Sequence, residues 1–183
     1  KKSGMATIKR FDISPFRSSA AALVNDFDAD KYIAIRSGRK MNRLSQMAVA
    51  ASKTAFAARP PRGAEETGVC FGTGFGCIET AESYLNKLFD EAAPFADPMD
   101  FTESVANAPA ANAAIEIGCS KLNATVTHRE GSAGIAVVQS ALALMEGHAN
   151  AVICGGVEEV TPHLYNVLDK TGALSRQGMP AGP

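Results

Sequence analysis

Residues 123–134 of the chain read Asn-Ala-Thr-Val-Thr-His-Arg-Glu-Gly-Ser-Ala-Gly and predict a short strand, a tight turn and the start of a helix. The helix is expected to run on to Gly147, and a second apolar strand follows at residues 151–155. Two strands joined by one helix form a parallel pair with a right-handed crossover. We therefore expect Glu130 at the N-terminus of a helix that begins near residues 131–132, with its carboxylate close to backbone amides that favour an anion.

Helices and one more strand are predicted on the N-terminal side of this segment. A buried strand is expected at residues 67–73, and the glycines that follow it do not have the spacing of a dinucleotide-binding loop. Short polar turns indicate loops over residues 4–30 and 90–100. Periodic apolar residues predict helices from residue 39 to a stop at Pro60-Pro61, over 78–88, and over 101–118 with a kink or entry at Pro109 and a cap at Gly118. This order of elements predicts an α/β fold.

Composition restricts the classes of function. The 183 residues are 46% hydrophobic and 20% charged, as in a single globular domain or in half of a larger one. A net charge of −1 without a polybasic run argues against nucleic acid as a partner. The apolar runs are too short to span a membrane, and residues 1–4 are not followed by the apolar stretch of a cleavable signal. We therefore expect a cytoplasmic protein that does not contact a membrane.

The cysteines and histidines do not form a metal-binding pattern. Cys70 and Cys77 are too far apart for a zinc knuckle, and the histidines have no i,i+4 spacing. Apolar or glycine neighbours predict that Cys70, Cys77, Cys119 and Cys154 are all buried reduced thiols. Neither a metal nor a cofactor is expected.

Several landmarks, in order along the chain, resemble those of β-ketoacyl-[acyl-carrier-protein] synthases, condensing enzymes of the thiolase-like fold. They are Ile8-Lys-Arg-Phe-Asp12, Arg39-Lys-Met-Asn-Arg43, Gly68-Val-Cys-Phe-Gly-Thr-Gly74, Asn107, Gly118 and the strand–turn–helix itself. The resemblance implies a thiolase-like N-terminal half with a mainly parallel sheet and flanking helices. Residues 1–183 are then expected to be the N-terminal domain of the family, while the two histidines and the lysine of its C-terminal half lie outside this chain.

The same resemblance puts Glu130 at the acyl-accepting cysteine of the family, counted back from Gly147 and Gly155-Gly156. Condensation needs a thiolate that attacks an acyl thioester and later leaves. A carboxylate is a weaker nucleophile, and an acyl anhydride is labile in water, so we expect an acyltransferase relative without condensing activity. The resemblance then implies a chain-length-factor type subunit of fatty acid or polyketide synthesis. Its partners are expected to be another synthase-like chain, in a homo- or heterodimer, and acyl carrier protein.

Two other functions stay open at this point. One is an enzyme that decarboxylates malonyl thioesters or condenses poorly, and the other is a structural scaffold without an acyl ligand. An open apolar tunnel beside Glu130 favours binding of an acyl chain, whereas a filled core favours the scaffold. Half of a thiolase-like fold also leaves apolar surface uncovered, so we expect residues 101–117 and 123–127 to be buried against another chain.

Residues near Glu130 have competing interpretations. His128 is either a strand-end histidine or a partner of Glu130, and Arg129 is a second group that can neutralise the carboxylate. Cys119 is interpreted as a loop or core thiol and not as a replacement nucleophile. The consecutive Glu158-Glu159 point apart on an extended segment, so we expect a salt bridge or a backbone contact and not paired carboxylate chemistry.

Overall fold

The computed structural model describes residues 4–58, 63–90 and 97–175, in two compact units. One unit is Asp28–Glu159, which contains Glu130, and the other combines Lys1–Phe27 with Val160–Pro183. The predicted helix stop at Pro60-Pro61 lies outside the described residues. In the described ranges, no helix is both long and apolar enough to cross a membrane.

A three-stranded parallel sheet organises the larger unit. Its strands are β3 (Thr67–Gly72), β4 (Asn123–Val126) and β5 (Ala151–Gly156), in the order β4-β3-β5. Phe71 of β3 is level with Thr125 on one side and with Gly155 on the other. Every residue of β3 is buried, as expected for the central strand of a parallel sheet that is covered on both faces. The three predicted strands and their parallel direction are confirmed. The direct pairing predicted for the strands before and after α6 is wrong, because β3 lies between β4 and β5 and pairs with both.

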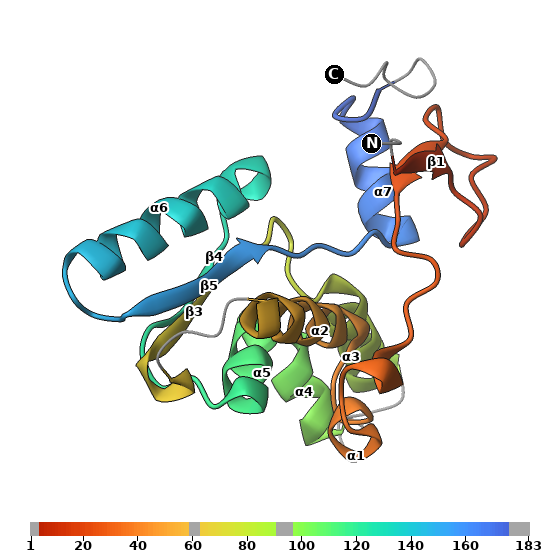
Figure 1. Ribbon diagram of the computed structural model, residues 1–183. Coiled ribbons are helices and arrows are strands. Elements are labelled where there is room, and N and C mark those ends of the chain that lie inside the picture. Colours follow the sequence, from red (N-terminus) through yellow and green to blue (C-terminus); the bar gives the residue numbers. More distant parts are fainter. Residues whose placement is uncertain (1–3, 59–62, 91–96, 176–183) are drawn as a thin grey trace. The chain divides into compact units, whose positions relative to one another are not determined.

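Helices cover both faces of this sheet (Figure 1). α6 (Ser132–Met145) lies on one face, and α2 (Arg43–Ala58) and α5 (Ala108–Ile117) lie together on the other. Small side chains allow α5 to approach α2 and the sheet closely, which burial of apolar area then stabilises. The core on this face consists of Ile33, Ala48, Val49, Val69, Phe71, Ala110, Ala113 and Ala114.

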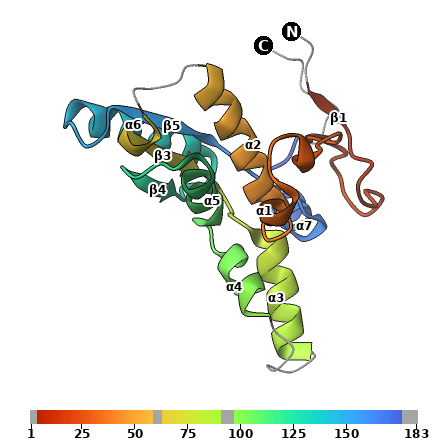
Figure 2. The same cartoon turned by 60° about the horizontal axis from the view of Figure 1, so that its bottom comes forward.

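A pair of helices, α3 (Ile78–Asp90) and α4 (Pro98–Ser104), extends away from the sheet (Figure 2). The two helices pack side by side. The rings of Tyr84 and Phe101 have centroids 5.7 Å apart, and Lys87 Nζ lies 2.6 Å from Asp100 Oδ2. These contacts fix α4 on α3. The helix predicted at residues 78–88 is confirmed, and its packing against α4 was not predicted from sequence periodicity.

The single helix predicted over residues 101–118 is wrong, because two helices share this segment. Asp97 caps α4 by accepting a hydrogen bond from Met99 N, so a helix begins where a loop was predicted. Val105 has an extended backbone and ends α4, and Pro109 lies in the first turn of α5. The predicted entry at Pro109 is therefore confirmed. So is the cap at Gly118, whose φ of 83° is in the left-handed region.

Helix α2 begins at Arg43 and not at residue 39, because a short helix precedes it. α1 (Ile35–Gly38) is a single turn. The Asn42 side chain then accepts a hydrogen bond from Ser45 N at 2.7 Å, which is the contact of a helix N-cap. Two further single turns of 3-10 helix, Ala29–Lys31 and Ala64–Glu66, precede α1 and β3.

The smaller unit contains a hairpin and one helix. β1 (Met5–Thr7) pairs antiparallel with β2 (Ala20–Ala22), so the loop predicted over residues 4–30 is wrong at these two short strands. α7 (Pro162–Lys170) is capped by Thr161, whose side chain accepts from Leu164 N. The ring of Tyr165 packs edge-on against Phe11 and Phe16, with centroids 5.7 and 5.2 Å away.

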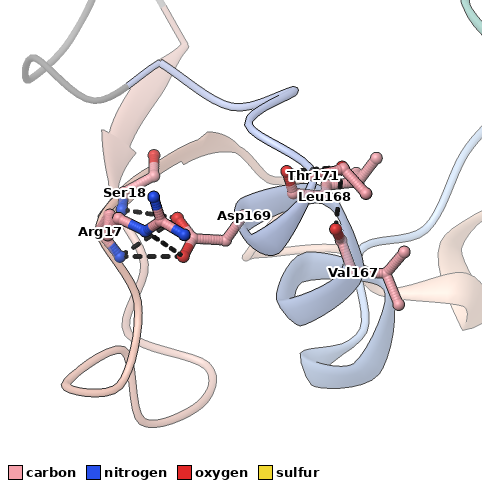
Figure 3. A network of polar contacts seen from close by, with 6 residues as sticks. All are labelled: Arg17, Ser18, Val167, Leu168, Asp169 and Thr171. Atoms are coloured by element: carbon pink, nitrogen blue, oxygen red, sulfur yellow. Dashed lines mark hydrogen bonds and ion pairs between the residues drawn. The ribbon is translucent and has the colours of Figure 1, made fainter.

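One buried carboxylate ties the hairpin to α7. Asp169 accepts hydrogen bonds from the backbone amides of Arg17 and Ser18, and the Arg17 guanidinium lies 3.8 Å from the same carboxylate (Figure 3). Asp169 is buried, whereas the side chain of Arg17 is half exposed. The two amides therefore supply the contacts that hold this carboxylate in place, because an exposed ion pair contributes little.

Candidate functional site

Glu130 lies in a single turn of 3-10 helix, η4 (Arg129–Gly131), between β4 and α6. α6 starts at Ser132, so the predicted position of Glu130 at a helix start is confirmed. The predicted contact of its carboxylate with backbone amides is wrong, since the exposed Glu130 side chain accepts no hydrogen bond from the described residues. Two amides at the turn have other acceptors, since Gly131 N donates to His128 O and His128 N donates to Ser132 Oγ.

The hydroxyl of Ser132 holds the turn in shape. Ser132 Oγ accepts a hydrogen bond from His128 N at 2.7 Å. Its single hydrogen has two acceptors within reach, Arg129 O at 2.7 Å and Thr73 O at 3.0 Å. Because Ser132 is only 2% exposed, losing this hydroxyl leaves buried polar groups without a partner. Ser132 thus connects the turn to the end of β3.

The backbone of the turn is sharply bent at Arg129. Its φ of 46° is in the left-handed region, which residues other than glycine adopt at a cost. Neither Arg129 nor His128 forms an ion pair or a side-chain hydrogen bond with Glu130 in the described part of the chain. The two sequence interpretations in which these residues neutralise Glu130 are therefore not supported, and the exposed His128 lies at the strand end.

Two glycines allow α6 to start directly against the sheet. A Cβ on Gly72, at the end of β3, would lie 2.2 Å from the carbonyl carbon of Ser132. A Cβ on Gly156, at the end of β5, would lie 2.7 Å from the Cβ of Ala133. Any side chain at either position must displace the first turn of α6. The residue at position 130 is thus placed by the ends of two neighbouring strands.

The loop after β3 is anchored by Glu158. Its carboxylate accepts hydrogen bonds from the backbone amides of Gly74 and Phe75 and from Thr73 Oγ1. A Cβ on Gly74 would be 3.4 Å from Arg129 Cα, so this loop lies against the turn that carries Glu130. Sequence analysis assigned no role to Phe75, which is 40% exposed at the tip of this loop. Its position between two glycines was the sequence feature that could have indicated this exposure.

Glu159 makes a different contact from its neighbour. It is buried and accepts a hydrogen bond from Glu79 N, in the first turn of α3, at 2.7 Å. An anion at the start of a helix is stabilised by the unpaired amides there. The predicted backbone contacts of Glu158 and Glu159 are therefore confirmed, and the two carboxylates serve separate loops.

The cysteines differ in burial, which sequence analysis did not predict. Cys70 and Cys77 are buried as expected, and burial raises the pKa of the Cys77 thiol to about 12. Cys119 is partly buried, and burial raises its pKa as well. Cys154 is exposed, so its prediction as a core thiol is wrong. It lies on β5, which is an edge strand among the described residues.

Two cavities share Glu103 as a lining residue, and neither is lined by Glu130. Their volumes are about 360 and about 730 Å³. The Glu103 carboxylate accepts hydrogen bonds from Asn42 N, Ser45 Oγ and Asn112 Nδ2, which fixes α4 to α2 and α5. Neither cavity is the predicted apolar tunnel beside Glu130. Among the described residues, no group of three or more potential metal ligands is present.

Comparison with protein families and curated proteins gives consistent matches. Residues 1–181 match the family model described as "Beta-ketoacyl synthase, N-terminal domain". A 3-oxoacyl-[acyl-carrier-protein] synthase 2 of Synechocystis is 32% identical over 181 residues, which are 95% of this chain and 43% of that protein. The synthase of the same name from Vibrio harveyi is 26% identical over 89% of this chain and 40% of its own length. The chain thus spans less than half the length of these relatives.

Solved structures show the same likeness. The ishigamide ketosynthase/chain length factor superposes with a TM-score of 0.74 and 26% identity, over 92% of this chain and 48% of that one. A type II polyketide acyl-carrier protein in complex with its ketosynthase gives a TM-score of 0.72 and 26% identity, over 81% of this chain and 44% of the other. These matches show that the described sheet and its helices have the thiolase-like α/β architecture.

Proposed function

Because the chain belongs to the β-ketoacyl synthase family, whose N-terminal domain its residues 1–181 match, we propose that it is a non-condensing subunit of the chain-length-factor type. In this function it pairs with an active synthase of fatty acid or polyketide synthesis and receives acyl-[acyl-carrier-protein] as the natural ligand. Likeness to a ketosynthase/chain length factor and to a ketosynthase complex with acyl-carrier protein supports the proposal.

The observation that carries the proposal is a glutamate in a turn that is otherwise built for an exposed nucleophile. Glu130 is exposed at the start of α6, and the contacts of Ser132 and the two glycines hold the backbone there in a fixed geometry. A carboxylate in this position lacks the soft, regenerable thiolate that acyl transfer needs. A fold that keeps this turn but lacks the nucleophile is consistent with a subunit that influences the reaction of a partner.

The remaining thiols do not replace the missing nucleophile at this turn. Cys77 is buried with a pKa raised to about 12, so it holds almost no thiolate at neutral pH. Cys70 and Cys154 lie within β3 and β5, two residues before those strands end at Gly72 and Gly156, and not in the turn that carries Glu130. The non-condensing function therefore fits the described residues better than a rescued enzyme does.

The test combines the full protein with an active synthase and acyl carrier protein loaded with malonyl and acyl groups. We expect a stable pair of the two chains in native mass spectrometry and a changed product chain-length distribution when this subunit is added. Glu130→Gln is the matched variant, and it should preserve both effects because no acyl group is carried at this position.

Two other results would replace the proposal. Release of acetyl-carrier protein from malonyl-carrier protein by this subunit alone, abolished in Glu130→Ala, assigns a decarboxylase. Absence of pairing and of any effect on the products assigns a structural scaffold without an acyl ligand.

A further inference from the structure

Thr73 is the residue at which the loop after β3 meets the turn before α6. It is only 3% exposed, and each of its polar groups has a partner. Its amide donates to Val126 O at 3.0 Å, and its carbonyl accepts from Ser132 Oγ at 3.0 Å. Its hydroxyl donates to Glu158 Oε1 at 3.2 Å and accepts from Gly76 N at 2.9 Å. Thr73 thus connects the end of β4, the start of α6 and the segment after β5.

A continuous chain of hydrogen bonds leads from Glu158 to this turn. Glu158 accepts from Thr73 Oγ1, and Thr73 O accepts from Ser132 Oγ. Ser132 Oγ accepts in turn from His128 N at 2.7 Å. Among the described residues, no hydrogen bond joins Glu158 directly to residues 128–132. An effect of Glu158 on the turn must therefore pass through the loop of residues 73–76.

The loop and the turn are in direct contact. A Cβ on Gly74 would lie 3.4 Å from both the Cα and the carbonyl oxygen of Arg129. Glu158 accepts hydrogen bonds from Gly74 N and Phe75 N as well as from Thr73 Oγ1, and bonds to an ionised acceptor are stronger than neutral ones. One carboxylate therefore sets the position of this loop against the turn.

From this network we propose that Glu158 is a positioning residue of the candidate site, which acts on the turn of Glu130 through Thr73 without touching that turn. With the carboxylate in place, Thr73 O stays within reach of the Ser132 hydroxyl. Without it, the loop loses its anchor, and the Ser132 hydrogen is left with Arg129 O alone. This role goes beyond the function proposed above and does not depend on it, because it concerns the geometry of the turn itself.

Two exposed side chains depend on this connection. Phe75 is 40% exposed at the tip of the loop, and Glu130 is exposed in the turn. Their sequence neighbours Gly74 and Arg129 are in contact, so Glu158 fixes an apolar group relative to a charged one. A ligand that meets both groups would thus be selected by a residue that it does not touch.

Hydrogen exchange of the full chain, measured at single amides, tests the connection. Glu158→Gln leaves one oxygen to accept from three donors, so exchange at Gly74 and Phe75 should accelerate by roughly tenfold. Exchange at His128, which Glu158 does not contact, should accelerate by roughly threefold or more, because its hydroxyl acceptor moves with the loop.

Two controls separate this connection from a general loss of stability. Glu159→Gln changes the neighbouring carboxylate, which accepts from Glu79 N, so it should accelerate exchange at Glu79 and not at His128. Thr73→Val deletes the hydroxyl and should reproduce the effect of Glu158→Gln on His128, whereas Thr73→Ser keeps the hydroxyl and should exchange like the wild type. Glu158→Gln added to Thr73→Val should have no further effect at His128, because both act through one network.

Three results overturn the proposal. The first is unchanged exchange at His128 in Glu158→Gln while Gly74 and Phe75 accelerate. The second is equal acceleration at His128 in Glu159→Gln, which assigns a general loosening of the sheet. The third is Thr73→Ser that exchanges like Thr73→Val. This last comparison does not use Glu158→Gln, so it decides even if that variant fails to fold.

Discussion

Glu130 and Ser132 occupy the same turn, but their side chains have opposite roles in its stability. The Glu130 side chain is exposed and accepts no hydrogen bond from the described residues, whereas the Ser132 hydroxyl is buried among three backbone partners. We expect Glu130→Gln to change the free energy of unfolding by less than about 0.5 kcal/mol. Ser132→Ala should lower it by about 1–3 kcal/mol, because His128 N then lacks its acceptor. Urea denaturation of both variants measures these changes in unfolding free energy, and equal losses would contradict the division of roles.

The nucleophile expected from the family is absent at residue 130, so the chain should not become acylated there. After incubation with acyl-carrier protein, the intact mass of the wild type should stay unchanged. Iodoacetamide provides the positive control, because it should label the exposed Cys154 while the buried Cys77, with its pKa raised to about 12, stays unmodified. A stable acyl group mapped to residue 130 or to any cysteine would restore the interpretation as an active condensing enzyme.

At the scale of elements, the start of α6 depends on two glycines, Gly72 and Gly156, where any Cβ would force the helix to shift. Gly72→Ala puts a Cβ 2.2 Å from the Ser132 carbonyl carbon, so the helix must move away from the sheet. We expect this variant to lose at least about 2 kcal/mol of unfolding free energy. Gly134→Ala is the matched control within α6, since its Cβ meets nothing within 4 Å. That variant should gain about 0.5–1 kcal/mol, because alanine favours the helix. Thermal or urea unfolding that ranks the two variants in the other order refutes the close approach.

The hairpin and α7 of the smaller unit should separate locally when one carboxylate is changed. Asp169→Asn keeps the size of the side chain but loses the charge that two backbone amides and Arg17 stabilise. We expect faster hydrogen exchange at the amides of Arg17 and Ser18, with protection of β3 unchanged. Arg17→Gln is the comparison variant, and it should have a much smaller effect because its side chain is half exposed. Equal effects of the two variants would assign the anchor to the ion pair.

Elements whose signals are local were predictable from sequence, and their contacts were not. The strand–turn–helix at Glu130 follows from apolar periodicity and turn residues within one short segment. The split between α4 and α5 was missed because the extended backbone at Val105 interrupts a segment whose apolar pattern is continuous. The exposure of Cys154 depends on which strand is at the edge, and local sequence does not contain the strand order. Glu158 was recognised only as a backbone contact, since its partners are more than 80 residues away.

For the whole molecule, exposed apolar side chains support the prediction that the chain is not a monomer. Ile115 is 76% exposed and Phe101 54% exposed, and both lie in the segment expected to be buried against another chain. The outer edge of β4 also has no neighbouring strand among the described residues. We expect an interface that buries about 2,000 Å² or more in total. Light scattering should give at least twice the 19.1 kDa of one chain, and a compact monomer at micromolar concentration would contradict the prediction.

The central position of β3 determines when the sheet can form during synthesis. β3 ends at Gly72, whereas its two neighbours begin at Asn123 and Ala151. Because synthesis runs from the N-terminus, β3 is made before both of its neighbours in the described sheet. Sheets built from distant strands form slowly, and an unpaired apolar strand is a template for aggregation. A chaperone that binds residues 67–72 on the nascent chain would thus protect the strand with which both β4 and β5 later pair.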